Sequence, residues 1–101
     1  MVFGKEIRLK RITRNGKLLC VTMDHGVSSG PIKGLEDMNS IIQKIQDGGA
    51  TAFLVHKGII RSLNFSPSIG VILHVSGSTN LSTSPNLKVK VASVEEGIRL
   101  G

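Results

Sequence analysis

A chain of 101 residues, 40% hydrophobic and 20% charged, is long enough for one folded domain and does not have the composition of a disordered protein. Its apolar runs fall well short of the roughly eighteen residues that a transmembrane helix needs, and its basic start lacks a segment typical of a signal peptide. The single cysteine, Cys20, cannot form an internal disulfide. We therefore expect a cytoplasmic protein with no membrane partner.

The formal net charge of +6 has two interpretations. A basic cluster early in the chain attracts phosphates, so a small module that binds nucleic acid or a phosphorylated ligand is one alternative. The chain has no Trp, no Tyr and only three Phe, whereas proteins that bind single strands normally stack bases on aromatic side chains. We expect no nucleic-acid partner, and a solvated basic face that helps to draw in an anionic substrate. The cluster comprises Lys5, Arg8, Lys10, Arg11, Arg14 and Lys17.

The first predicted elements are a helix and a buried strand. Residues 3–14 have the pattern of a short amphipathic helix with Phe3, Ile7 and Ile12 on one face, and Asn15-Gly16 predicts a turn. Residues 18–23 form an apolar run without alternation, which is typical of a parallel strand buried on both faces. Cys20 lies inside this run, so we expect a buried and inert thiol.

The next predicted helix begins at Leu35, with Glu36 and Asp37 in its first turn, and ends at Gly48-Gly49. Further apolar runs at 51–55 and 69–73 predict two more strands, with a short helix at 58–63 between them. A polar loop at 79–86 and a short exposed strand at 88–91 follow. A helix begins at Ser93, where Ser93 and Glu96 have the spacing of a capping box. This order of elements is typical of βαβ units.

Each of the three predicted strands ends in histidine followed closely by glycine. The three histidines are His25, His56 and His74, and parallel pairing brings such strand ends to one rim. Asp24 precedes His25, and neighbouring residues on a strand face opposite ways. We assign Asp24 to substrate hydroxyls or proton transfer, and His25 to orientation of the substrate or contact with it. An ordinary connecting turn remains the alternative for the loop that follows.

A metal site formed by Asp24, His25, His56 and His74 is the competing interpretation of this rim. Their spacing matches no local metal motif, and no second carboxylate falls at a strand end, so we expect no metal. Ser76 does not lie in a Gly-x-Ser-x-Gly elbow. The sequence also lacks a P-loop and a dinucleotide fingerprint, and we expect no cofactor.

Three segments closely resemble the archaeal-type class I aldolases, which are (β/α)8 barrels of the DeoC/FbaB group. They are residues 23–34, which begin Met23-Asp24-His25-Gly26-Val27-Ser28-Ser29-Gly30-Pro31, residues 55–61, which begin Val55-His56-Lys57-Gly58, and residues 72–79, which include His74-Val75-Ser76-Gly77. The resemblance covers residues 7–101 and includes two branches, archaeal fructose-bisphosphate aldolase and 2-amino-3,7-dideoxy-D-threo-hept-6-ulosonate synthase. The residues around Asp24 resemble the synthase branch more closely.

The resemblance implies a lysine Schiff base with a sugar-phosphate-like ketone, an aldehyde as the second substrate, and no metal. In the synthase branch a 1-deoxy-hexodiulose 6-phosphate donates a three-carbon unit to aspartate semialdehyde, for the biosynthesis of aromatic amino acids. Asp24 matches the proton acceptor of the family. The run Asp24, His25, Gly26, Val27 and Ser28 matches the substrate-binding segment.

The chain also departs from the family pattern. The family's imine-forming lysine and its tyrosine proton donor lie on later strands, and this chain has no tyrosine. Lys57 follows a strand end, but the family does not use that position. We therefore expect residues 1–101 to be the first three βα units of a single barrel domain of about 250 residues. The fragment alone is expected to be inactive, and the full-length protein to be a homo-oligomer.

Overall fold

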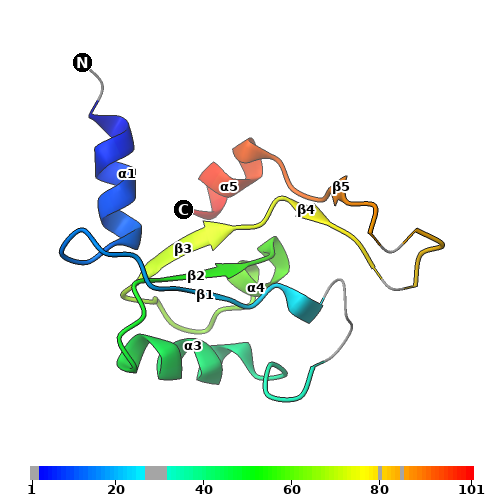
Figure 1. The fold of residues 1–101 in the computed structure, drawn as a ribbon, viewed down its shortest axis with the longest axis horizontal. Coiled ribbons are helices and arrows are strands. Elements are labelled where there is room, and N and C mark those ends of the chain that lie inside the picture. Colours follow the sequence, from blue (N-terminus) through cyan, green and yellow to red (C-terminus); the bar gives the residue numbers. More distant parts are fainter. Residues whose placement is uncertain (1–2, 27–31, 80, 85) are drawn as a thin grey trace.

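A three-stranded parallel sheet lies at the centre of the computed structural model, which describes residues 3–26, 32–79, 81–84 and 86–101 (Figure 1). Helices and a small two-stranded ribbon surround this sheet. In chain order the elements are α1 (Gly4–Ile12), β1 (Cys20–Thr22), α3 (Met38–Asp47), β2 (Ala52–Val55), α4 (Lys57–Arg61), β3 (Gly70–Leu73), β4 (Ser76–Gly77), β5 (Val89–Lys90) and α5 (Val94–Leu100).

The sheet confirms the predicted βαβ topology. Its strand order is β1-β2-β3, and both pairs are parallel. The register aligns Cys20 with Ala52 and Ala52 with Gly70. Bonds from Met23 N to Leu54 O (2.8 Å) and from His74 N to Val55 O (2.9 Å) continue the ladder past the strands. The three strands therefore deliver the residues that follow them to one end of the sheet.

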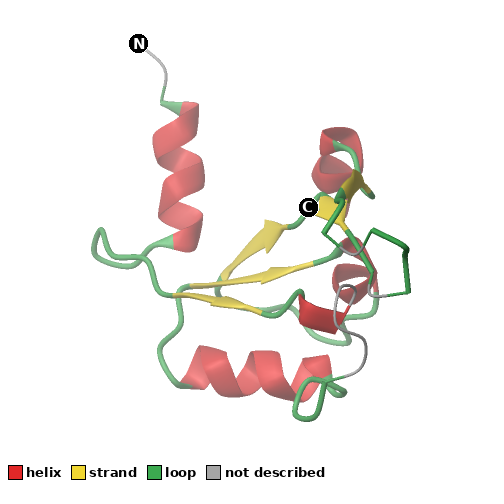
Figure 2. Cartoon of the chain, turned by 45° about the vertical axis from the view of Figure 1, so that its right-hand side comes forward, coloured by secondary structure: helices red, strands yellow, loops and turns green. Residues whose placement is uncertain are grey.

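The buried core lies between the sheet and α3, which runs along one face of the sheet (Figure 2). Phe53 and Val55 lie two residues apart on β2, so both point toward this face, where they pack with Met38 and Ile42 of the helix. Phe53, Val55 and Ile42 are fully buried. Burial of side chains of this size contributes about 1.5–3 kcal/mol each, so this layer holds the strands in register.

The prediction that the first strand is buried on both faces is wrong. The strand begins at Cys20 rather than at residue 18, and Leu18 and Leu19 are 54% and 55% exposed. β1 stands at the edge of the sheet, and among the described residues no layer comparable to α3 covers its other face. Cys20 is accordingly only partly buried. Partial burial and the nearby Asp24 charge still raise the pKa of its thiol, which keeps the thiol protonated at neutral pH.

The predicted N-terminal helix is present as α1, but its apolar face is not packed. Phe3 and Ile7 are 57% and 55% exposed, and the helix contacts the sheet at β3, where Arg11 and Ile12 lie against Gly70. There Gly70 is required, because a Cβ at this position would lie 2.7 Å from Ile12 Cγ2 and closer still to the Arg11 carbonyl oxygen. α1 therefore closes on the base of β3, at the end opposite to the histidines.

The Asn15-Gly16 turn is confirmed. Asn15 and Gly16 both have positive φ angles, 54° and 74°, and the flanking residues Arg14 and Lys17 exchange backbone hydrogen bonds. This is the geometry in which Asn-Gly pairs are favoured.

Two helix starts depend on side-chain caps. α3 begins at Met38 rather than at Leu35, because the Asp37 carboxylate accepts a hydrogen bond from Ser40 N (3.2 Å) as the N-cap. Glu36 therefore lies before the helix, not in its first turn. The predicted stop is confirmed by Gly49, whose φ is 100°. α5 follows Ser93, whose hydroxyl accepts from Glu96 N at 3.1 Å, as the capping spacing predicts.

The remaining elements differ from the predictions in detail. The short helix after β2 begins one residue earlier than predicted, at Lys57, and ends at Arg61. The exposed strand predicted at 88–91 is β5, and it pairs antiparallel with β4, which the sequence analysis missed. None of the helices in the described ranges is long and apolar enough to cross a bilayer.

Candidate active site

The carboxyl ends of the three parallel strands bring Asp24, His56 and His74 together. The register pairs Thr22 with Leu54 and Leu54 with Ile72, and each of the three polar residues lies two positions further along its strand. Because side chains alternate along a strand, all three project from the same face of the sheet. Together with Ser76, which contacts His74, these three residues form what we call the rim cluster.

His74 is the centre of the rim cluster. Its Nδ1 lies 2.6 Å from Asp24 Oδ2, and its Nε2 lies 3.0 Å from Ser76 Oγ. The Asp24 and His74 side chains are 24% and 22% exposed, so both remain accessible from solvent. A short contact between a carboxylate and an imidazole is a charge-assisted hydrogen bond, which is stronger than a bond between neutral groups.

His56 supports the His74 ring from the neighbouring strand. The two rings are stacked, with centroids 4.6 Å apart and an interplanar angle of 21°. His56 Nδ1 is buried and has no hydrogen-bond partner within the described part of the chain. Burial, together with the positive charge that His74 can carry, lowers the pKa of His56. His56 is therefore held mainly as a neutral ring.

The predicted site residues have three different outcomes. The expectation of a shared rim is confirmed for Asp24, His56 and His74. His25 is exposed and lies outside the cluster, so its pairing with the other histidines is wrong. Gly26 is described and exposed, whereas Val27 and Ser28 lie outside the described residues. The roles of these residues toward a substrate stay predictions.

Two contacts of the cluster were not anticipated from the sequence. The direct bond between Asp24 and His74 joins residues fifty positions apart. The sequence analysis considers Ser76 only as a nucleophile, although its position two residues after His74 is a usable signal. On an extended segment such spacing brings two side chains to the same face.

The rim cluster also has donor atoms suited to a metal. One ligand atom each from Asp24, His56 and His74 lies within 4.8 Å of the others. The metal alternative therefore retains three of its four predicted residues and loses His25. Both ring nitrogens of His74 are already engaged by Asp24 and Ser76, so a cation would have to displace at least one of these bonds.

A pocket of about 230 Å³ opens beside Asp24 and His56. Much of its wall is apolar, including Met23, Met38 and Ile59. Two larger hollows lie against α1, β3 and α5, and their walls contain none of the rim cluster. Of these three pockets, the smallest one is therefore the pocket that adjoins the rim cluster.

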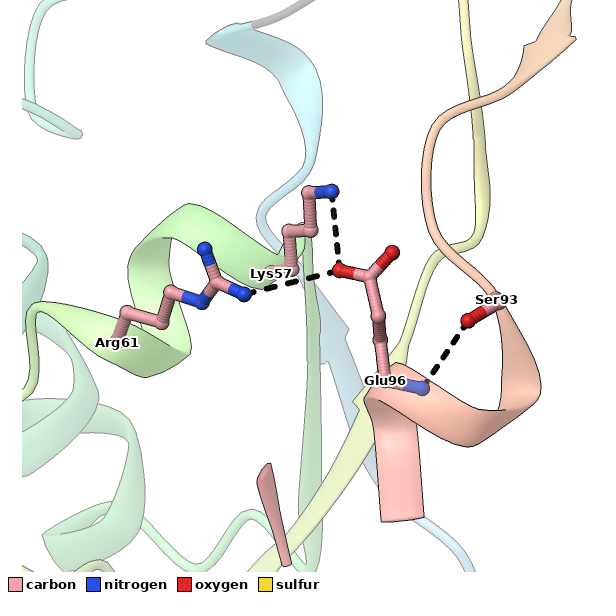
Figure 3. A network of polar contacts seen from close by, with 4 residues as sticks. All are labelled: Lys57, Arg61, Ser93 and Glu96. Atoms are coloured by element: carbon pink, nitrogen blue, oxygen red, sulfur yellow. Dashed lines mark hydrogen bonds and ion pairs between the residues drawn. The ribbon is translucent and has the colours of Figure 1, made fainter. Parts of the chain in front are cut away.

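Lys57 belongs to a network with Arg61 and Glu96 (Figure 3). Its Nζ lies 3.1 Å from Glu96 Oε2, and Arg61 Nη2 lies 3.7 Å from the same oxygen. The hydrogen bond from Lys57 and the two positive charges lower the pKa of Glu96. This helix-pairing network joins α4 to α5 and directs Lys57 toward α5.

A parallel sheet with polar residues at its carboxyl ends is the arrangement in which α/β enzymes, including (β/α)8 barrels, place their active sites. Residues 18–101 match the DeoC/LacD family aldolases, and the chain belongs to this family.

Within this family, the chain is similar to two archaeal synthases. The chain is 38% identical over 102 residues to 2-amino-3,7-dideoxy-D-threo-hept-6-ulosonate synthase 1 of Archaeoglobus fulgidus, an alignment that covers 99% of the chain and 38% of the relative. It is 35% identical over 99 residues to the corresponding synthase of Halobacterium salinarum, with coverages of 97% and 37%. The chain thus spans well under half the length of these relatives.

A solved structure confirms the fold. An archaeal fructose-1,6-bisphosphate aldolase, with its catalytic lysine covalently bound to the carbinolamine intermediate, superposes with a TM-score of 0.81 at 29% identity. The match covers 95% of this chain and 40% of that one. The three βα units are therefore those of an aldolase (β/α)8 barrel.

Proposed function

We propose that residues 1–101 form the N-terminal part of one barrel domain of a Schiff-base synthase that transfers a three-carbon unit from a sugar-phosphate-like ketone to an aldehyde. The synthase relatives suggest 2-amino-3,7-dideoxy-D-threo-hept-6-ulosonate synthesis as its reaction. We propose a 1-deoxy-hexodiulose 6-phosphate and aspartate semialdehyde as its substrates, as the resemblance to the synthase branch implies. The observation that carries this proposal is the carboxylate of Asp24 at a shared strand end, hydrogen-bonded to His74 at 2.6 Å.

In this proposal Asp24 is the proton acceptor. A lysine amine condenses with the ketone of the substrate, releases water and gives an iminium ion that accepts electrons without a metal or cofactor. Asp24 takes the proton of a substrate hydroxyl while the neighbouring carbon–carbon bond breaks and its electron pair moves to the iminium nitrogen. The cleaved fragment leaves as an aldehyde, and the enamine that remains on the lysine attacks the second aldehyde, whose oxygen takes up the proton held by Asp24. Water then hydrolyses the new iminium ion and frees the product and the lysine.

The imine-forming lysine is proposed to follow residue 101. Lys57 is a poor candidate because its Nζ is paired with Glu96 rather than with Asp24. Asp24, His25, Gly26, Val27 and Ser28 are proposed to contact the substrate. We further propose that the whole enzyme is cytoplasmic, needs no cofactor and forms a homo-oligomer.

The second candidate is fructose-bisphosphate cleavage, which the likeness to the solved archaeal aldolase favours. Both reactions use the same iminium chemistry, so the rim cluster fits either. The two differ in substrate, and separate turnover assays, one with fructose 1,6-bisphosphate alone and one with the hexodiulose phosphate and aspartate semialdehyde, distinguish them.

The test uses a chimera in which residues 1–101 replace the aligned stretch of the Archaeoglobus fulgidus synthase. Borohydride added with the ketone substrate should reduce the imine and leave a covalent adduct on a lysine, found by mass spectrometry. Turnover of the ketone with aspartate semialdehyde should accompany the adduct. A folded chimera that gives no adduct with either ketone would contradict the proposed mechanism. Salt-dependent binding of the chain to RNA would support the nucleic-acid alternative instead.

A further inference from the structure

We propose that His74 is the positioning residue for Asp24, and that Ser76 allows His74 to keep this role in both of its charge states. The inference rests on the proposed function, because Asp24 is the proton acceptor only in that reaction. It concerns a different question, namely what holds the carboxylate in place.

The first argument is the reach of the contact. Asp24 follows β1 and His74 follows β3, and β2 lies between these strands. Neighbouring strands are about 4.8 Å apart, so the two backbones are separated by about 10 Å. The side chains nevertheless meet at 2.6 Å, above the end of β2. Such a contact needs both side chains to lean across the intervening strand.

The second argument is the support beneath the His74 ring. His56, at the end of the intervening strand, stacks on this ring at a centroid distance of 4.6 Å. Its neutral state is favoured by burial, so it adds packing without a second positive charge beside His74. The ring is therefore fixed by His56 on one face and by hydrogen bonds at both nitrogens.

The third argument concerns the protons. An ionised carboxylate can only accept hydrogen bonds, so His74 Nδ1 carries a hydrogen and donates it to Asp24. Nε2 then bears a proton only when the ring is charged. The Ser76 hydroxyl can donate to a bare Nε2 or accept from a protonated one. His74 can therefore gain or lose a proton at Nε2 without releasing Asp24.

Two titratable side chains contact the His74 ring, those of Asp24 and His56. Asp24 faces it from β1 and His56 from β2, and Lys88, from the segment before β5, also acts on His56. The carboxylate is held at one oxygen, Oδ2, and the side chain keeps about a quarter of its surface exposed. That surface is the part of Asp24 that a substrate hydroxyl can reach.

The test uses the amide side chains of Asn and Gln, which place a donor near one or the other ring nitrogen of His74. In the chimera, His74→Asn keeps a donor close to the position of Nδ1, whereas His74→Gln extends its donor toward the position of Nε2. We expect His74→Ala and His74→Gln to lower kcat about 10- to 100-fold, a loss no larger than the rate factor that general-base catalysis contributes. His74→Asn should recover most of this loss, and KM should change less than 3-fold in all three variants.

Ser76→Ala should lower kcat by about 2- to 10-fold, the value of one hydrogen bond, with exposed Ser66→Ala as its matched control. Equal kcat values in the wild type and His74→Ala would overturn the inference, as would an Asn variant no better than the Gln variant. Failure of the unmutated chimera to form the borohydride adduct would count against the proposed function instead.

A second measurement does not depend on folding of the variants or on turnover. In the unmutated chimera labelled with ¹⁵N-histidine, His74 should show a protonated Nδ1 at every pH at which Asp24 is ionised. A neutral His74 with its proton on Nε2 would overturn the inference even if the enzyme were active.

Discussion

His56 and Lys57 are consecutive in the sequence, yet they serve two networks with different physical properties. His56 belongs to the rim cluster, where the Asp24 and His74 side chains are less than a quarter exposed and one nitrogen of His56 is buried without a partner within the described chain. Lys57 belongs to the helix-pairing network, whose members are more exposed, Arg61 at 60%. Polar groups shielded from water interact more strongly, and exposed ion pairs contribute little to stability. The rim cluster is therefore suited to chemistry, and the helix-pairing network to the docking of α5.

The largest expected difference is in catalysis. In the chimera, Asp24→Asn should lower kcat about 10²- to 10⁴-fold, because the amide cannot accept the substrate proton. Glu96→Gln should change kcat less than about 3-fold, because its network does not face the rim. Steady-state kinetics measure both, with exposed Asp47→Asn as a further control. Similar losses in the Asp24 and Glu96 variants would remove the distinction between the two networks.

The next largest effect concerns the base of β3, which carries His74 but no part of the helix-pairing network. Gly70→Ala should lower the free energy of unfolding by about 2 kcal/mol or more, because its Cβ would meet the Arg11 carbonyl and Ile12. Gly58→Ala in α4 meets nothing within 4 Å, so it should be neutral or slightly stabilising. Urea unfolding of the chimera measures both. A tolerated Gly70→Ala would contradict the packing of α1 on β3.

A smaller effect is the pH dependence that comes from His56. Its folded-state pKa lies below the ordinary value of 6.5, so the unfolded chain binds more protons as the pH falls. This contribution to stability is present above about pH 6.5 and is lost on acidification. His56→Phe keeps a ring against His74 but cannot titrate. Urea unfolding at pH 7.5 and 5.5 should show a smaller loss of stability in the variant, by less than about 1 kcal/mol. An equal or larger loss in the variant would contradict the assignment.

The smallest effect belongs to Glu96. Its pKa is lowered from the ordinary value of 4.5, so it stabilises the fold at neutral pH and stops doing so as the pH falls through the lowered value. Glu96→Gln should lower the melting temperature slightly at pH 7 and at low salt. The difference should shrink in 1 M salt, where exposed charges are screened. A difference that is unchanged by salt would indicate a packing role.

The sequence predicted the fold well because its signals were local. Unalternated apolar runs, glycine stops and the Ser93 cap each depend on a few neighbouring residues, and the parallel sheet followed from their order. Burial was predicted less well, because Leu18, Leu19 and Phe3 are apolar but lie at an edge or on an unpacked helix. Whether an apolar side chain is covered depends on distant segments.

The candidate site was predicted in part for the same reason. Asp24, His56 and His74 were identified because each follows a strand, and strand ends meet at one rim. The register alone decides that Asp24 meets His74 across β2 and that His25, one residue on, does not join them. The capture of Lys57 by Glu96 likewise depends on the docking of α5.

A crystal structure of the chimera, reduced with borohydride in the presence of its ketone substrate, tests the central claim most directly. We expect Asp24 within hydrogen-bond distance of a hydroxyl of the trapped substrate, with His74 Nδ1 still on Oδ2. A trapped substrate remote from Asp24, or a carboxylate turned away from His74, would contradict the account.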